Sequence, residues 1–177
     1  MKQETRQFIN DLATEIRLAN GITVPIDNME NVVNILGGEI EKINPFSEDS
    51  YFDGTIRKNS KNSFLIRIDP FQGPERENFT IAHELGHLFL HMGYQVLPEL
   101  WNEQDDKEFA RFGRNEQEYQ AHEFAAAFLM PEEEYREAIN NNIEDDGRIN
   151  IKNVAEYFRV SVPAATNRGK FLGVIEW

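Results

Sequence analysis

Apolar residues recur with helical spacing near the start of the chain, with strand-like patterning in the middle, and with helical spacing again thereafter. Residues 5–20 place apolar side chains every three or four positions, and Asn20-Gly21 provides a helix C-terminus. A second helix is predicted where Asp27 and Glu30 have the spacing of a capping box, and Gly37-Gly38 ends it. The chain is thus predicted to begin with two helices.

Three short strands are predicted next, at Glu39–Ile43, Tyr51–Arg57 and Ser63–Asp69. The four residues Asn59-Ser60-Lys61-Asn62 are typical of a hairpin turn between the last two strands. We therefore expect a small antiparallel sheet.

The remainder of the chain is predominantly helical in its pattern. The polar, mixed stretch 94–114 gives no clear assignment. The sequence predicts an α+β fold, with one early sheet and a mainly helical remainder, and its length predicts a single domain over residues 1–177. The helices are expected at about 77–92, 115–130, 131–139, 151–159 and 163–171.

The chemistry of the chain is concentrated in one predicted helix that contains His83-Glu84-Leu85-Gly86-His87. Two histidines four residues apart lie about 40° apart around a helix and one turn apart along it, so they can share a metal ion. Glu84 points to the rim of the same site, where it is placed to act on a water molecule rather than to ligate the metal. The pattern predicts a catalytic metal site.

A catalytic zinc ion needs a third protein ligand, and three residues compete for that role. Glu118 is the leading candidate, because it shares a helix face with inward-facing alanines. His122 lies one turn beyond Glu118, and His91 lies one turn beyond His87. We expect His122 to lie in the core or behind a ligand, and His91 to face the helix C-terminus.

The charge and composition exclude several other functions. The chain carries 18 basic and 31 acidic residues, a net charge of −13, so we expect no direct binding to nucleic acid. Residues 99–146 alone carry 15 acidic and 4 basic side chains, either as a solvated helical surface or as a docking face for a basic partner. The absence of cysteine and of a long apolar run leads us to expect a cytoplasmic protein without disulfides, a secretory signal or a membrane span.

Three stretches resemble the ImmA/IrrE family of bacterial zinc metallopeptidases, as does the end of the chain. They are Gly21–Asp27 with the helix to Gly38, Phe79–His91, and Glu118–Pro131. The ending Val154–Ile175 looks like the family's helix-turn-helix-like tail, so 151–175 is expected to form such an element within the single domain.

The resemblance implies a gluzincin-like zincin core that binds Zn²⁺ through His83, His87 and Glu118, with Glu84 as general base. It also implies an endopeptidase that cleaves helix-turn-helix repressors in mobile-element, stress-response or toxin–antitoxin-like circuits. One departure is His122, where the family usually has Asn, and this concerns the surroundings of the ligands rather than the ligands themselves.

Two other functions are compatible with the sequence. Residues 151–171 resemble a helix-turn-helix, which would suit a DNA-binding or antitoxin-like regulator, although only Asn167 and Arg168 are candidates for contacting bases. Arg159 also stands where such turns often have Gly. A zinc-binding protein that has lost proteolysis is the other alternative, and the presence of Glu84 argues against it.

Overall fold

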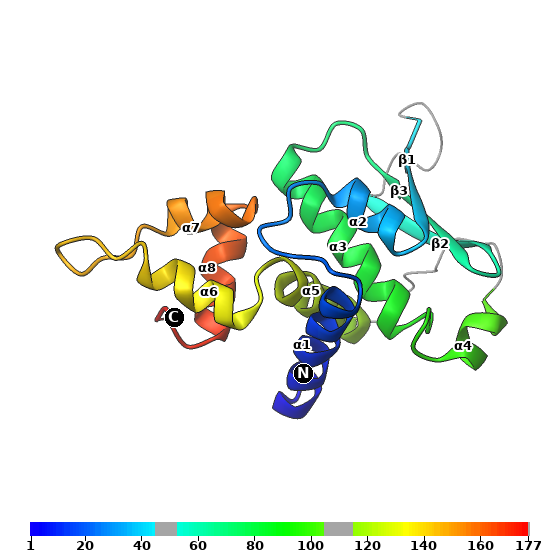
Figure 1. The fold of residues 1–177 in the computed structure, drawn as a ribbon, viewed down its shortest axis with the longest axis horizontal. Helices are drawn as coiled ribbons and strands as arrows, with labels where there is room; N and C mark the ends of the chain where they lie inside the picture. Colours follow the sequence, from blue (N-terminus) through cyan, green and yellow to red (C-terminus); the bar gives the residue numbers. More distant parts are fainter. Residues whose placement is uncertain (45–52, 105–114, 177) are drawn as a thin grey trace.

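The computed structural model describes residues 1–44, 53–104 and 115–176, and it confirms the α+β prediction. Figure 1 shows a long helix, α3, flanked on one side by the sheet and on the other by further helices. The elements run in the order α1 (Gln3–Ala19), α2 (Met29–Ile35), β1 (Gly38–Lys42), β2 (Gly54–Ser60), β3 (Ser63–Ile68), α3 (Pro74–Leu90), α4 (Pro98–Glu103), α5 (Asn115–Leu129), α6 (Glu132–Asn140), α7 (Ile151–Phe158) and α8 (Val162–Phe171).

The sheet is mixed, so the expectation of an antiparallel sheet was wrong for one pair of strands. Strands β2 and β3 form the predicted antiparallel hairpin, but the strand order is β1-β3-β2 and β1 runs parallel to β3. A turn sequence predicts only that two strands adjacent in the chain pair with each other, as β2 and β3 do. Strand β1 instead pairs with β3, which is not its neighbour in the sequence. The hairpin turn is also tighter than predicted, because Ser60 still pairs with Ser63.

The second helix begins one residue later than its capping box indicates. Asn28, in an extended conformation, is the N-cap, and its side chain accepts a hydrogen bond from the backbone N–H of Asn31 at 3.1 Å. Asp27 binds the Arg159 guanidinium instead, at 2.8 Å. Asp and Asn are equally good N-cap residues. The ion pair of Asp27 with Arg159 therefore explains why Asn28, and not Asp27, caps this helix.

Helices α3 and α5 approach each other closely at a glycine. A Cβ atom on Gly86 would lie 2.9 Å from the Cα of Ala121, so only Gly fits this crossing without moving a helix. Leu85, Phe124 and Phe128 are fully buried around the contact. Helix α1 packs on the other side of α5. Gly86 of α3 and Ala121 of α5 therefore determine the distance between the functional side chains that the two helices carry.

The C-terminal helices α6, α7 and α8 pack mainly on one another and form one end of the molecule (Figure 1). Tyr135 of α6 is buried and donates a hydrogen bond of 2.6 Å to the carbonyl of Ala165 on α8. The turn between α7 and α8 places Arg159 in the left-handed region, with φ of 54°, where the sequence pattern favours Gly. The hydrogen bond from Asn78 on α3 to the Arg159 carbonyl, together with the Asp27 pair, holds this turn against the core.

The stretch that the sequence left unassigned contains helix α4. Trp101 of α4 is buried, donates to the Lys61 carbonyl at 2.7 Å and packs edge-on against Tyr94. Residues 105–114 of that stretch, and Tyr51 and Phe52 of the second predicted strand, lie outside the described residues. Across the described ranges, no helix combines the length and the apolar character needed to cross a membrane.

Candidate metal centre

Helix α3 buries the His-Glu-x-x-His sequence instead of exposing it. Pro74 occupies its first turn, and the segment from Thr80 to Phe89 is buried throughout. His87 has no exposed surface and His83 has 7%. Buried imidazoles need polar partners, so these histidines are not the solvated surface residues that the same spacing also allows.

Helix α5 brings Glu118 across from the two histidines. The Nε2 atoms of His83 and His87 are 3.1 Å apart, and the Glu118 carboxylate oxygens lie 3.2 Å from the first and 3.4 Å from the second. Tetrahedral zinc with bonds of about 2.0–2.1 Å would place its ligands about 3.3 Å apart. The three donor atoms, two nitrogens and one oxygen within 4.8 Å of one another, therefore suit a zinc ion.

A chain of hydrogen bonds behind His87 orients that imidazole. His87 Nδ1 lies 2.9 Å from His91 Nδ1, and His91 Nε2 lies 3.0 Å from the amide oxygen of Gln120. The amide oxygen accepts from His91 Nε2, so His91 Nδ1 accepts in turn from His87 Nδ1. This leaves the Nε2 lone pair of His87 directed at the candidate site. His91 is thus at the end of α3, as expected, but it acts as a partner of His87.

His122 lies at the edge of the site and outside the group of three. Its ring meets the His83 ring edge-on, with centroids 4.5 Å apart, and its Nδ1–H donates to the Glu118 carbonyl at 2.8 Å. The residue is exposed, so of the two positions expected for His122, in the core or behind a ligand, the core position was wrong. The reason is that the α5 face carrying Glu118 and His122 opens into a pocket.

This pocket has a volume of about 1110 Å³ and is lined by residues of both α3 and α5, including His83, Glu84 and Glu118. Glu84 is only 1% exposed, yet its carboxylate forms part of the wall. A Cβ atom on Gly54 of β2 would lie 3.2 Å from Glu84 Oε1, so the bare backbone of β2 leaves space for this carboxylate. The structure therefore places Glu84 beside the three candidate ligands and in contact with the cavity.

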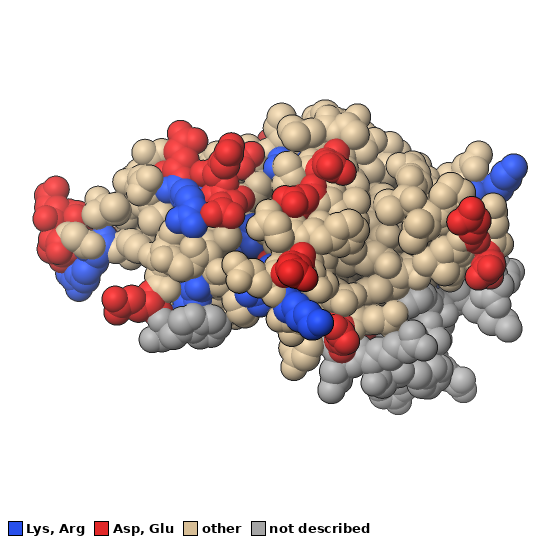
Figure 2. All heavy atoms as spheres, turned by 90° about the horizontal axis from the view of Figure 1, so that it is seen from below, with Lys and Arg blue, Asp and Glu red and all other residues tan. Residues whose placement is uncertain are grey.

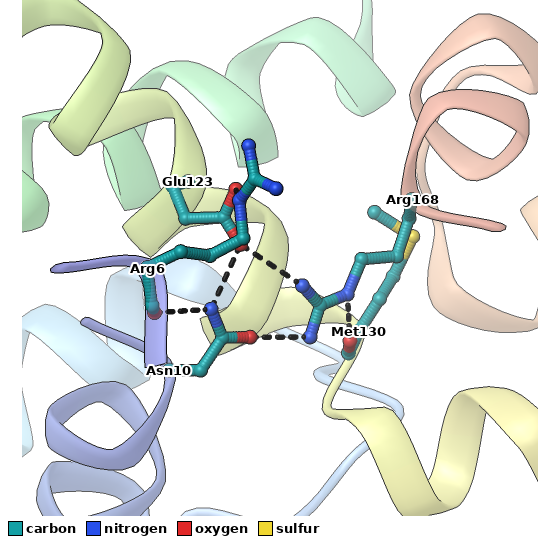
Figure 3. Close-up of polar contacts among 5 residues, drawn as sticks. All are labelled: Arg6, Asn10, Glu123, Met130 and Arg168. Atoms are coloured by element: carbon teal, nitrogen blue, oxygen red, sulfur yellow. Dashed lines mark hydrogen bonds and ion pairs between the residues drawn. The ribbon is translucent and has the colours of Figure 1, made fainter. Parts of the chain in front are cut away.

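A second polar cluster lies on the same helix, and the sequence analysis missed it (Figure 3). Glu123 accepts from Arg6 at 3.1 Å, from Asn10 at 2.8 Å and from Arg168 at 3.3 Å. Arg168 also donates to the Met130 carbonyl and to the Asn10 amide oxygen. No local spacing signals a cluster whose members come from α1, α5, α8 and the α5–α6 junction.

Burial is what distinguishes Arg168 from a DNA-contacting side chain. Only 2% of the residue is exposed, and this burial lowers the pKa of Arg168 from its usual value, while nearby Glu123 and Glu132 oppose the shift. The other candidate for contacting bases, Asn167, lines the pocket. Arg168 is therefore not available to a DNA groove, whereas Asn167 is exposed.

Comparisons with known proteins agree with this architecture. A solved structure of a Mycobacterium tuberculosis transcriptional regulator matches 94% of this chain with a TM-score of 0.56 and 16% identity, which shows a shared fold. This chain spans half the length of that protein. No curated protein sequence matches. The model of Peptidase M78, the IrrE N-terminal-like domain, matches residues 44–170, and the chain therefore belongs to this family of peptidase domains.

Proposed function

We propose that this protein is a zinc-dependent endopeptidase. The observation that carries the proposal is the convergence of His83, His87 and Glu118 beside the buried carboxylate of Glu84, in a chain of a peptidase family. The three side chains would hold the ion, and the pocket beside them offers room for a segment of a substrate protein.

The chemistry divides between the ion and the protein. When bound, zinc supplies Lewis-acid polarisation of the scissile carbonyl and makes water a stronger acid. Glu84 accepts the proton of the attacking water and passes it to the leaving amine. The bare backbone of Gly54 leaves room for the carboxylate beside the cavity. The hydrogen bond from His87 to His91 fixes which nitrogen faces the ion.

The substrate that we propose is a helix-turn-helix repressor in a mobile-element, stress-response or toxin–antitoxin-like circuit. Such proteins carry a basic face, and the net charge of −13 on this chain would attract it. The transcriptional regulator with the same fold is compatible with a regulatory setting. A cytoplasmic location, together with the absence of cysteine, would suit such a circuit.

The second candidate function is DNA binding by α7 and α8. The observation in its favour is that the solved structure with the same fold is that of a transcriptional regulator. Burial of Arg168 and the pocket position of Asn167 argue against it. DNA retention with no metal in the purified protein would favour this alternative, whereas one zinc per chain and no DNA would favour the peptidase.

The decisive experiment is Glu84→Gln. We expect cleavage of a helix-turn-helix repressor encoded beside the gene to fall by a factor of about 10²–10⁴, because a general base is lost. Zinc content, measured by mass spectrometry of the metal, should stay at the wild-type level, since Glu84 is not one of the three ligands.

The matched control is Glu116→Gln, which makes the same change at an exposed position on α5. It should retain both cleavage and zinc. Loss of zinc from Glu84→Gln, or cleavage at the wild-type rate, would contradict the role given to Glu84.

A further inference from the structure

The pocket that contains the candidate ligands extends to a second group of charged side chains. Arg6, Glu123 and Arg168 line it together with Glu118 and Glu84. The two groups share helix α5, on which Glu118 and Glu123 are five residues apart. A helix rises about 1.5 Å and turns about 100° per residue, so the two residues lie about 7.5 Å apart along the axis and about 140° apart around it.

The cluster around Glu123 carries an excess of positive charge. Two guanidinium groups, those of Arg6 and Arg168, share the single carboxylate of Glu123. Glu132 also acts on Arg168, but its own carboxylate binds Arg136 at 2.8 Å. A partly desolvated excess charge is unfavourable, and an incoming anion would offset it.

The geometry of Arg6 leaves part of its guanidinium available to such an anion. Its Nε donates to Glu123, and the group lies 4.6 Å above the centre of the Phe171 ring. Figure 3 shows the guanidinium extending past Glu123, away from Asn10 and Arg168. Its two terminal nitrogens have no hydrogen bond to any described residue, and 34% of the side chain is exposed.

We propose that Arg6 forms a subsite that binds a carboxylate of the substrate. The inference rests on the proposed peptidase function, since the substrate is taken to lie along the pocket. The two terminal nitrogens of an arginine fork match the two oxygens of a carboxylate, and the Glu123 and Phe171 contacts hold the fork in place.

Because Glu123 and Phe171 hold Arg6 in one place in the pocket, this carboxylate should occupy one fixed position along the substrate. The peptidase should therefore favour Asp or Glu at one position near the scissile bond. This specificity would act inside the pocket and is distinct from attraction between the acidic surface and a basic partner.

The test is digestion of a random decapeptide library, acetylated and amidated at its ends, by the zinc-loaded full chain. We expect Asp and Glu to be enriched about tenfold at one fixed position near the cut, because hydrogen bonds to charged groups are strong and Arg6 is only partly buried. Arg6→Gln should abolish the enrichment, and Arg6→Lys should retain part of it. Arg148→Gln, an exposed control outside the pocket, should keep it.

A second library with free C-termini distinguishes the two sources of a carboxylate. Cuts clustered at one fixed distance before the free end would assign the subsite to a chain terminus rather than to a side chain. Cleavage by the wild type with no acidic preference in either library would overturn the subsite and leave the peptidase proposal standing.

A measurement without catalysis separates the two proposals. The arginine Nε–H NMR signal of Arg6, assigned by its loss in Arg6→Gln, should shift on addition of N-acetylglutamate N-methylamide. It should not shift with the matched glutamine compound. A shift without any cleavage would retain the subsite and contradict the peptidase, whereas the absence of a shift would overturn the subsite. Circular dichroism of each variant confirms that the comparison is between folded proteins.

Discussion

The two ends of the pocket-facing side of α5 carry polar groups of different construction, with the Glu118 side chain 35% exposed and that of Glu123 6% exposed. At Glu118 the partners are two imidazoles from one neighbouring helix, and together they present donor atoms to an ion. At Glu123 the partners come from α1 and α8 and neutralise one another in part. The first group would be completed by a bound metal ion, whereas the second is complete in itself and links α1, α5 and α8. Mutation should therefore affect metal binding at one end and stability at the other.

The largest effect should come from Glu118→Ala, which removes one of three candidate zinc ligands. Zinc affinity should fall by about 10²–10³-fold, because free energies of about 10–16 kcal/mol for structural zinc are shared among four ligands. His91→Ala, which removes only the partner of His87, should cost about 10–100-fold. Competition with a chromophoric chelator measures both values.

His122→Ala is the control for this prediction, because His122 lies outside the group of three. It should lose less affinity than Glu118→Ala does. A variant at His122 that loses its zinc while Glu118→Ala keeps it would require a different ligand set.

The next effect should come from Arg168→Met, which breaks the second cluster. Removing one partner of a buried ion pair costs about 3–5 kcal/mol, and the lower end applies here because Arg6 and Asn10 still satisfy Glu123. The melting temperature should fall by about 6–12 °C for a chain of this size. Zinc stoichiometry should be unchanged below that temperature, and a joint loss of zinc and stability would show that the two ends of α5 are not independent.

A smaller effect concerns Tyr135, whose hydrogen bond joins α6 to α8. Burial raises the pKa of Tyr135 from its usual value of 10 to about 12. The folded state thus favours the neutral phenol, so this contribution to stability is complete below pH 10 and is lost as the pH rises from 10 to 12.

Tyr135→Phe should cost about 1 kcal/mol at neutral pH, the value of one hydrogen bond. Its stability deficit relative to the wild type should shrink between pH 10 and 12. Urea unfolding of both proteins across this pH range measures the difference between their free energies of unfolding. Other titrating groups are the same in both proteins, so their contributions cancel in this difference. A constant deficit would contradict the raised pKa.

The smallest effect concerns the acidic surface, which belongs to neither end of α5. Figure 2 shows acidic side chains gathered toward the end of the molecule formed by α6–α8, and α6 begins with Glu132, Glu133 and Glu134. Cleavage of a basic repressor should slow as salt rises from 0.01 to 0.15 M, since the Debye length falls from about 30 to about 8 Å. Operator DNA should protect the repressor. A flat salt response without protection would exclude electrostatic steering.

The difference between the two groups on α5 also explains what the sequence could predict. His83, Glu84 and His87 are close because one helix repeats every 3.6 residues, and that information is local. Glu118 was identified by its inward-facing neighbours and by the family resemblance. The Glu123 cluster joins residues as distant as Asn10 and Arg168, 158 positions apart, and no spacing rule relates them.

The same distinction holds for the fold. Helix periodicity and the β2–β3 hairpin were predicted, because each is encoded within a short stretch. The parallel pairing of β1 with β3 was not, since it depends on how strands meet after the intervening chain has folded. The choice of Asn28 over Asp27 as N-cap likewise depends on Arg159, which is 132 residues away from Asp27.

The close approach of α3 and α5 at Gly86 would determine the size of ion that the candidate centre accepts. Glu118 is one turn from Ala121, which the missing side chain of Gly86 allows to lie against α3. Zinc–oxygen bonds are about 2.0–2.2 Å long, and calcium–oxygen bonds about 2.3–2.6 Å. A few tenths of an ångström thus separate a transition metal from an alkaline-earth ion, and that is the order of displacement that one methyl group at residue 86 would impose. Selectivity among ions would therefore depend on Gly86, a residue outside the group of candidate ligands.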